Sequence, residues 1–225
     1  MDLYTGKEIP KLIADKFEFY NYNHAVEIMS QAFPAEWNDI ITALVSFKLY
    51  ESDLSEAGGS ETTIPGKIED VLYPKKWRNT KISGDLHIQF YDRIVDQKKY
   101  DDRPTRESII NGYVSEHHVD YLKGRVAFGL EWNKKDLAFD RTIAAMKAFY
   151  ECQIISAGII MTRSAELNEV FKIITDNEGK PIIRKYGSSS TWMGKLLPRL
   201  DSRQAGGCPI LAIGIKKSCI EGYNE

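Results

Sequence analysis

Hydrophobic and polar positions alternate most clearly between Arg125 and Trp132. One side of this stretch is bulky and apolar and carries Val126, Phe128, Leu130 and Trp132. The other side is thin and carries one carboxylate, Glu131. A period of two is typical of a strand, so we expect the bulky side to enter a core. We expect Glu131 on the thin side to be uncrowded.

Apolar residues three and four positions apart predict two longer helices. The first begins at Pro34 and carries the stripe Trp37, Ile41, Leu44 and Phe47. The second follows the alternating strand and carries Phe139, Ile143, Met146 and Tyr150. Shorter helices are predicted at 24–31 with Asn23 as N-cap, 67–73, 165–174 and 192–197.

Two nearly continuous apolar runs, Ile154–Met161 and Pro209–Ile215, predict strands buried on both faces. Buried strands that alternate with helices indicate an α/β fold with a central mixed β-sheet flanked by helices. Polar stretches rich in glycine, serine and proline predict loops at 51–63, 176–179, 186–191 and 198–207.

The segment from 84 to 118 has no clear period. Leu86–Tyr91 fits either a strand or the start of a helix, and Pro104 with Thr105 predicts a helix that runs to about Asn111. With 225 residues the chain has the length of one domain. We therefore expect a single domain over 1–225, with a subdomain inserted around 84–115 as an alternative.

Composition narrows the class of protein. The net charge of −2 gives no global attraction for nucleic acid, so a DNA-binding surface has to be a local patch. The three cysteines lack metal or redox spacing and fit a reducing cytoplasm. No apolar run reaches the roughly 18 residues of a membrane span, and the first residues do not have the pattern of a signal peptide. We expect a cytoplasmic protein.

Two carboxylates suggest a metal site. Asp120 lies eleven residues before Glu131, close enough for a short turn to bring it back to the strand. Such a pair can hold Mg²⁺, which lowers the pKa of a bound water and stabilises charge on a phosphate. A nearby lysine such as Lys134 would bind the phosphate or position the water. The alternative is an edge strand with a solvated glutamate.

Other charged residues allow two interpretations. Lys75, Lys76, Arg78 and Lys81 surround Trp77, which fits either a phosphate-contact patch or a basic helix end. Asp136 and Asp140 sit in the first turns of the helix after the strand, where negative charge favours the helix dipole. The neighbouring His117 and His118 lack further ligands at zinc spacing.

Several stretches in order resemble the type II restriction endonucleases of the BglII/BstYI group, with BamHI more distant. They are YNHAVEI (22–28), LYPKKWRN (72–79), DYLKGRVAFGLEW (120–132), AFY (148–150), IISAGIIM (154–161) and PILAIGI (209–215). The resemblance covers roughly two thirds of the chain. It implies a restriction-endonuclease-like PD-(D/E)XK core and a homodimer that uses Mg²⁺ to cut both strands of double-stranded DNA. It further implies a palindromic site with a GATC core, such as RGATCY, and four-base 5′ overhangs.

The resemblance also assigns the catalytic positions. Asp120 matches the first metal ligand of the family and Glu131 the third position, while Gly129 stands where the family has a glutamate. Three explanations remain open. Asp136 or Asp140 replaces the missing ligand, Asp120 and Glu131 hold the metal alone, or the chain binds DNA without cutting it.

The resemblance places DNA readout mainly in two loops. Asn133 and Lys134 match positions that face the major groove, where lysine can donate to guanine, and Lys135 follows them. Ser188, Ser189 and Ser190 lie in a loop that resembles one reading base edges. Further contacts are expected from Arg199, Arg203 and Thr80, together with the patch at Lys75, Lys76 and Arg78. The alternative is ordinary loop polarity.

Overall fold

A computed structural model describes residues 2–55, 63–94, 96, 99–187 and 189–223. The chain divides into two compact units, one formed by Met1–Thr80 with Val119–Glu225 and the other by Lys81–His118. None of the helices in the described ranges has the length and apolar character needed to span a bilayer.

A six-stranded mixed sheet organises the fold, with strand order β1-β8-β7-β6-β5-β2. Its strands are β1 (Phe17–Tyr22), β2 (Arg78–Phe90), β5 (Arg106–Lys123), β6 (Val126–Leu130), β7 (Ala157–Arg163) and β8 (Ile210–Ile215). The three central strands β6, β7 and β8 run parallel, and β1 and β5 are antiparallel to their neighbours. Every residue of β6, β7 and β8 is buried, as expected for parallel strands covered on both faces.

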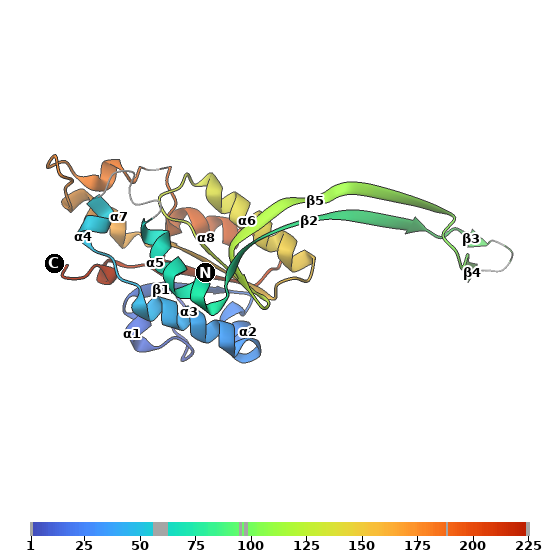
Figure 1. The fold of residues 1–225 in the computed structure, drawn as a ribbon, viewed down its shortest axis with the longest axis horizontal. Coiled ribbons are helices and arrows are strands. Elements are labelled where there is room, and N and C mark those ends of the chain that lie inside the picture. Colours follow the sequence, from blue (N-terminus) through green and yellow to red (C-terminus); the bar gives the residue numbers. More distant parts are fainter. Residues whose placement is uncertain (1, 56–62, 95, 97–98, 188, 224–225) are drawn as a thin grey trace. The chain divides into compact units, whose positions relative to one another are not determined.

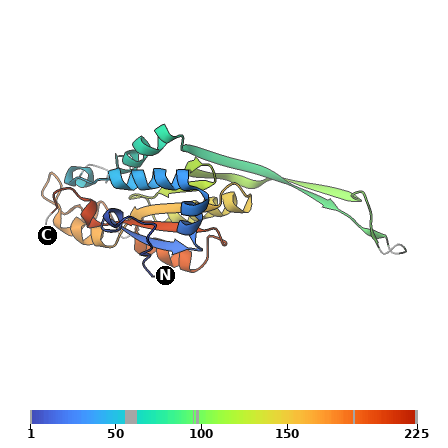
Figure 2. The same cartoon turned by 90° about the horizontal axis from the view of Figure 1, so that it is seen from below.

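Helices cover both faces of this sheet (Figures 1 and 2). The helices are α1 (Lys11–Ala14), α2 (Ala25–Ala32), α3 (Pro34–Ser46), α4 (Glu51–Ser55), α5 (Thr63–Leu72), α6 (Leu137–Glu151), α7 (Glu166–Ile173) and α8 (Met193–Asp201). Short 3-10 turns occur at Tyr73–Lys75, Ile182–Arg184 and Lys217–Cys219. Side chains from α2, α3 and α5 share one core with Phe128 and Leu130 of β6. The predicted α/β class, a mixed central sheet flanked by helices, is confirmed.

A glycine sets how closely α6 approaches the opposite face. A Cβ at Gly158 of β7 would lie 2.6 Å from Met146 Sδ and 2.9 Å from Ile210 Cδ1. Any larger residue would therefore require the side chains of Met146 and Ile210 to move, and α6 also carries side chains that surround the candidate site described below.

Three predictions of secondary structure from the sequence were wrong. Residues 106–111, expected to be helical, begin strand β5, because pairing with β2 overrides the weak helix-start signal at Pro104. Part of the 51–63 loop is α4, while 56–62 lie outside the described residues. Helix α8 continues through Pro198 to Asp201, where a loop was expected. Strand β1, Phe17–Tyr22, was not predicted from the sequence.

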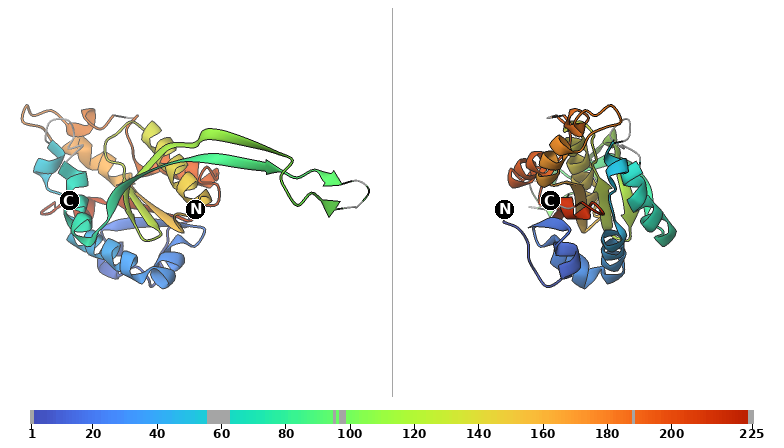
Figure 3. Two further views of the ribbon diagram at one scale, coloured as in Figure 1. Left: turned by 45° about the vertical axis from the view of Figure 1, so that its right-hand side comes forward. Right: turned by 90° about the vertical axis from the view of Figure 1, so that its left-hand side faces the viewer.

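The second unit is a hairpin of two long strands, β2 and β5, extended by the short pair β3 (Arg93–Ile94) and β4 (Lys99–Tyr100) (Figure 3). Polar contacts hold one side of the hairpin. Lys81 Nζ lies 2.8 Å from Glu116, and Glu107 accepts hydrogen bonds from Gln89 and contacts His87. The prediction of one domain with an inserted subdomain around 84–115 stays a prediction.

A buried carboxylate, Asp39 of α3, ties three segments of the first unit together. It accepts hydrogen bonds from Lys75 Nζ at 3.0 Å, Trp77 Nε1 at 3.0 Å and Lys123 Nζ at 2.7 Å. Burial raises the pKa of Asp39, but the hydrogen bonds from Lys123, Trp77 and Lys75 outweigh it, so the pKa lies below its usual value. Asp39 therefore anchors the chain on either side of the hairpin.

Replacement of Asp39 by asparagine is expected to lower the free energy of unfolding by about 3 kcal/mol at pH 7, because cations lose a buried partner. Since the folded pKa of Asp39 is lowered, its contribution is complete above the unfolded pKa of about 4 and disappears as the pH falls through the folded pKa. Urea unfolding at pH 7 and at pH 3 measures this.

The matched control is Asp15→Asn. Asp15 pairs with Lys11 on the surface, where the two side chains are 59% and 86% exposed, and such pairs contribute little. Equal losses in the two variants, or none in Asp39→Asn, would show that the buried cluster does not stabilise the fold.

Candidate active site

A tight hairpin brings Asp120 back to β6, as the sequence predicts. Lys123 pairs with Val126 across the turn, and Gly124 within it has φ of +51°, a value that favours glycine. Tyr121 pairs with Phe128 in the same register. One further step along this register places Asp120 beside Gly129.

Gly129 faces both Asp120 and helix α6. A Cβ built at Gly129 would lie 3.5 Å from Asp120 Oδ2 and 3.4 Å from Thr142 Cγ2, which are ordinary contact distances. The φ angle of Gly129 is not positive, so its backbone does not require glycine. A Cβ at this position would therefore fit between Asp120 and α6.

Glu131 lies two residues further along the same side of the chain and is only 3% exposed. Its Oε1 accepts a hydrogen bond of 2.5 Å from Thr142 Oγ1. Its Oε2 lies 3.2 Å from Lys134 Nζ, but the angles are not those of a hydrogen bond, and this buried oxygen has no hydrogen-bond partner among the described residues. The expectation of an uncrowded Glu131 was wrong, because α6 covers this face.

The backbone of Glu131 is also fixed. Its carbonyl accepts hydrogen bonds from Thr162 Oγ1 at 2.8 Å and Thr191 Oγ1 at 3.1 Å, and its N–H donates to Met161 at 2.9 Å. Thr142 and Thr191 were not identified from the sequence, because a threonine that bonds a carboxylate or a carbonyl carries no local motif.

Asp136, the residue before α6, and Asp140, in its first turn, do not face Gly129. Arg199 of α8 donates to both oxygens of Asp140, at 2.7 and 3.1 Å, and this contact holds the pKa of Asp140 below its usual value. Asp136 Oδ2 lies 3.8 Å from Lys195 Nζ. Thr142 faces Glu131, and Asp140 is two residues earlier, about 200° around the helix. The structure thus turns Asp140 toward α8 and away from Gly129.

The residues around Gly129 fit a hard divalent cation in part. Asp120 is half-buried, and Glu131 offers one buried oxygen without a hydrogen-bond partner. Hard cations such as Mg²⁺ accept carboxylate oxygens and keep several waters, so two carboxylates are enough to hold one. In the described part of the chain, no third Asp, Glu, His or Cys joins such a group.

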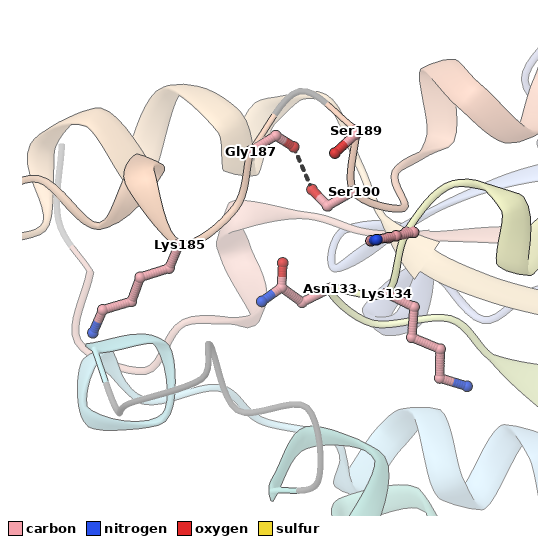
Figure 4. A pocket seen from close by; sticks show the side chains of 7 residues that line it. Asn133, Lys134, Lys185, Gly187, Ser189 and Ser190 are labelled. Atoms are coloured by element: carbon pink, nitrogen blue, oxygen red, sulfur yellow. Dashed lines mark hydrogen bonds between the residues drawn. The ribbon is translucent and has the colours of Figure 1, made fainter.

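The two loops expected to read DNA line one open pocket of about 360 Å³ (Figure 4). It is lined by Asn133, Lys134, Lys135, Lys185, Gly187, Ser189 and Ser190. Lys135 and Ser190 form a β-bridge, Asp136 N–H donates to Ser189 at 2.7 Å, and Thr191 N–H donates to Lys134 at 2.8 Å. Ser188 lies outside the described residues. Lys185 is an additional lysine that the sequence did not single out.

Positive charge dominates the lining of this pocket. Lys134 and Lys135 are exposed, Lys185 is half-buried, and no acidic residue is among the residues that line the pocket. The lining residues begin at Asn133, two residues after Glu131, and Lys134 Nζ lies 3.2 Å from Glu131 Oε2, so cationic and polar groups stand beside the carboxylate. Phosphate and base-edge acceptors of DNA suit such a surface.

The basic segment 75–81 behaves differently. Trp77 is fully buried and Lys75 is paired with Asp39, so neither forms part of an open aromatic and cationic surface. Lys76 and Arg78 are exposed, and Arg78 Nη1 donates to the carbonyls of Tyr73 and Trp77 at 2.8 and 2.7 Å. Arg78 therefore caps the preceding helical turn, which is the structural alternative considered above.

The remaining candidates are spread over the first unit. Thr80 is half-buried and donates to the carbonyl of Arg78 at 3.1 Å. Arg199 is held by Asp140, while Arg203 is exposed in the turn after α8, with φ of +59°. The structure does not bring Arg199 or Arg203 into the lining of the pocket.

Comparison with known protein families identifies the family of this chain. The family model described as restriction endonuclease BglII/BglIII matches residues 17–215, from β1 to the end of β8. Comparison with curated protein sequences finds no match. The matched region contains the whole central sheet, the carboxylates at Asp120 and Glu131, and both pocket loops. The chain therefore belongs to the BglII/BglIII family of type II restriction endonucleases and is a site-specific deoxyribonuclease that binds double-stranded DNA.

Proposed function

We propose that this endonuclease uses Mg²⁺ to cut both strands of a palindromic DNA site with a GATC core, such as RGATCY, leaving 5′ overhangs. The arrangement of Asp120, Thr142 and Glu131 around Gly129 is the observation that carries the catalytic part. The GATC core and the overhangs rest on the resemblance of the sequence to the BglII/BstYI group.

Asp120 and Glu131 are the residues that would hold the metal. When bound there, Mg²⁺ lowers the pKa of a water molecule and stabilises the charge that builds on the phosphate. Glu131 Oε1 accepts a hydrogen bond from Thr142 and keeps a second lone pair that could contact the metal, which leaves Oε2 to accept a proton. Lys134 Nζ, 3.2 Å from Oε2, adds a positive charge next to this oxygen and would bind the phosphate or position the attacking water.

In the reaction, the water oxygen bonds to phosphorus as the bond from phosphorus to the leaving sugar oxygen breaks. The proton lost by the water passes to Glu131 Oε2, the carboxylate oxygen that lacks a hydrogen-bond partner in the described structure. A proton from solvent completes the leaving hydroxyl. Thr142 keeps the glutamate in one orientation through these steps.

A palindromic site presents the same half-site twice, and one copy of the chain supplies one active site. We therefore propose a homodimer in which each protomer cuts one strand, with protein and DNA sharing a two-fold axis. The pocket with Asn133, Lys134 and Ser190 would then read one half-site per protomer.

Incubation of purified protein with plasmid DNA and Mg²⁺ tests the proposal. Discrete fragments whose ends map to GATC-containing palindromes are expected, with 5′ extensions on sequencing of the ends. Uncut plasmid over a wide range of enzyme concentration, or fragments without a common sequence at their ends, would contradict it.

Gly129 favours a second candidate, a member of this family that binds its DNA site without cutting it. Gly129 stands where the resemblance places a third carboxylate, and none of the described acidic side chains completes a group of three there. Cleavage by the unmodified chain would exclude this candidate. Specific binding without cleavage would support it.

A further inference from the structure

A buried arginine, Arg163, contacts the pocket wall, the part of the pocket lining formed by Gly187, Ser189 and Ser190. It is the last residue of β7, it is 1% exposed, and burial lowers the pKa of its guanidinium to about 10. No carboxylate in the described ranges forms an ion pair with it. The guanidinium instead lies 5.6 Å and 5.5 Å from the ring centroids of Phe171 and Tyr186. A buried charge without an acidic partner is costly, so its retention calls for an explanation.

The hydrogen bonds of Arg163 point to that explanation. Its Nε donates to Asn168 Oδ1 on α7 at 3.1 Å, and its Nη2 donates to Ser190 Oγ at 2.8 Å. The Ser190 hydroxyl in turn donates a hydrogen bond to the carbonyl of Gly187 at 2.6 Å. The guanidinium therefore fixes Ser190 and Gly187, two residues that line the pocket.

The pocket wall is also hydrogen-bonded to the segment after β6, which contains Glu131, Lys134 and Lys135. Ser190 bridges Lys135, and the next residue, Thr191, donates its N–H to Lys134 and its hydroxyl to the carbonyl of Glu131. A shift of Ser190 would thus change the position of the pocket wall relative to Lys134 and to the carboxylate of Glu131.

We propose that Arg163 is a positioning residue that sets DNA sequence discrimination, by holding Ser190 in place against Lys134 and Lys135. Arg163 itself is too buried to touch DNA, so it acts through the Ser190 hydroxyl. The inference rests on the proposed function, since it assumes that this pocket reads the DNA site.

Two variants test this bond from its two ends. Arg163→Lys keeps a positive charge but lacks the planar fork of donors, and Ser190→Ala removes the acceptor with little change in volume. Asn168→Ala is the matched control, because it removes the other hydrogen bond of the same guanidinium on α7, away from Ser190. Melting temperatures show whether each variant is folded.

The measured quantity is the discrimination ratio, which is kcat/KM for the recognised duplex divided by kcat/KM for the same duplex with one base pair changed. The same ratio of affinities is measured in Ca²⁺, so that binding is assessed apart from cleavage. The ratio is expected to fall about tenfold in Arg163→Lys and in Ser190→Ala, which corresponds to one hydrogen bond. It is expected to fall no further in the double variant, and to stay unchanged in Asn168→Ala.

Three results would overturn the inference. They are an unchanged ratio in both Arg163→Lys and Ser190→Ala, fully multiplicative losses in the double variant, or an equal loss in Asn168→Ala. Absence of any discrimination in the unmodified protein would instead overturn the proposed function, and this result is visible before any variant is made.

Discussion

Replacement of Asp120 by alanine is expected to reduce Mg²⁺-dependent cleavage by more than about 100-fold, while specific DNA binding in Ca²⁺ is retained. Changes at residues that merely support a metal ligand cost about 10- to 100-fold, so loss of a ligand should cost at least as much. Asp120 is half-buried beside Gly129, and the neighbouring Tyr121 and Lys123 keep their own strand pairing. Single-turnover cleavage and gel shifts measure the two effects.

Asp140→Asn is the matched control for this experiment. It also removes a carboxylate from the region of the candidate site, in the first turn of α6, but Arg199 binds that carboxylate. Cleavage within a few-fold of the unmodified protein is expected. If Asp140→Asn were as inactive as Asp120→Ala, the helix aspartate would have to replace the missing ligand, contrary to the geometry.

Introduction of glutamate at Gly129 is expected to lower the Mg²⁺ concentration for half-maximal cleavage by about tenfold, because divalent-metal affinity rises with the number of anionic ligands. The first side-chain atom fits, since it would meet Thr142 and Asp120 at 3.4 and 3.5 Å. Without metal the added charge repels Asp120 and Glu131. The melting temperature in EDTA should therefore fall and recover when Mg²⁺ is added.

Gly129→Gln is the matched control, because it separates the effect of the added charge from the effect of the added side-chain volume. Gly129→Gln has nearly the same size without the charge, so neither the metal affinity nor the metal dependence of melting should change. Calorimetric titration with Mn²⁺ gives a readout that does not depend on cleavage. Unchanged Mn²⁺ affinity in Gly129→Glu would mean that position 129 does not face a metal site. If the unmodified chain is inactive and Gly129→Glu cuts, the second candidate function is supported.

The sequence predicted those parts of the fold that depend on local pattern. The period of two in 126–132, the apolar runs of β7 and β8, and the stripe of α6 each specify an element, and the stripe also specifies the side that α6 buries. The pairing of Asp120 with the region of Gly129 also follows locally, because a two-residue turn joins the strands. Each of these signals lies within one short segment of the chain, where hydrophobic period and turn chemistry agree.

What the sequence missed depends on contacts between distant segments. The burial of Glu131 comes from α6 folding over it, and the pairing of Asp140 comes from Arg199, 59 residues later in the chain. Strand β5 was mistaken for a helix near Pro104 because its partner β2 was itself ambiguous. Trp77, expected in a cationic surface patch, is instead buried against Asp39. Arg163 gave no signal, since the residues that surround it are remote in sequence.

The hydroxyl of Thr191 bonds the carbonyl of Glu131, so the pocket wall and the active-site strand are joined through the backbone. A change in the length of the loop that contains Thr191 would therefore move Glu131 as well. Retargeting the enzyme to a new DNA sequence should consequently succeed through exchange of exposed side chains such as Ser189 and Lys135, with the length of the segment preserved. Grafting whole loops from other nucleases would trade activity for altered recognition.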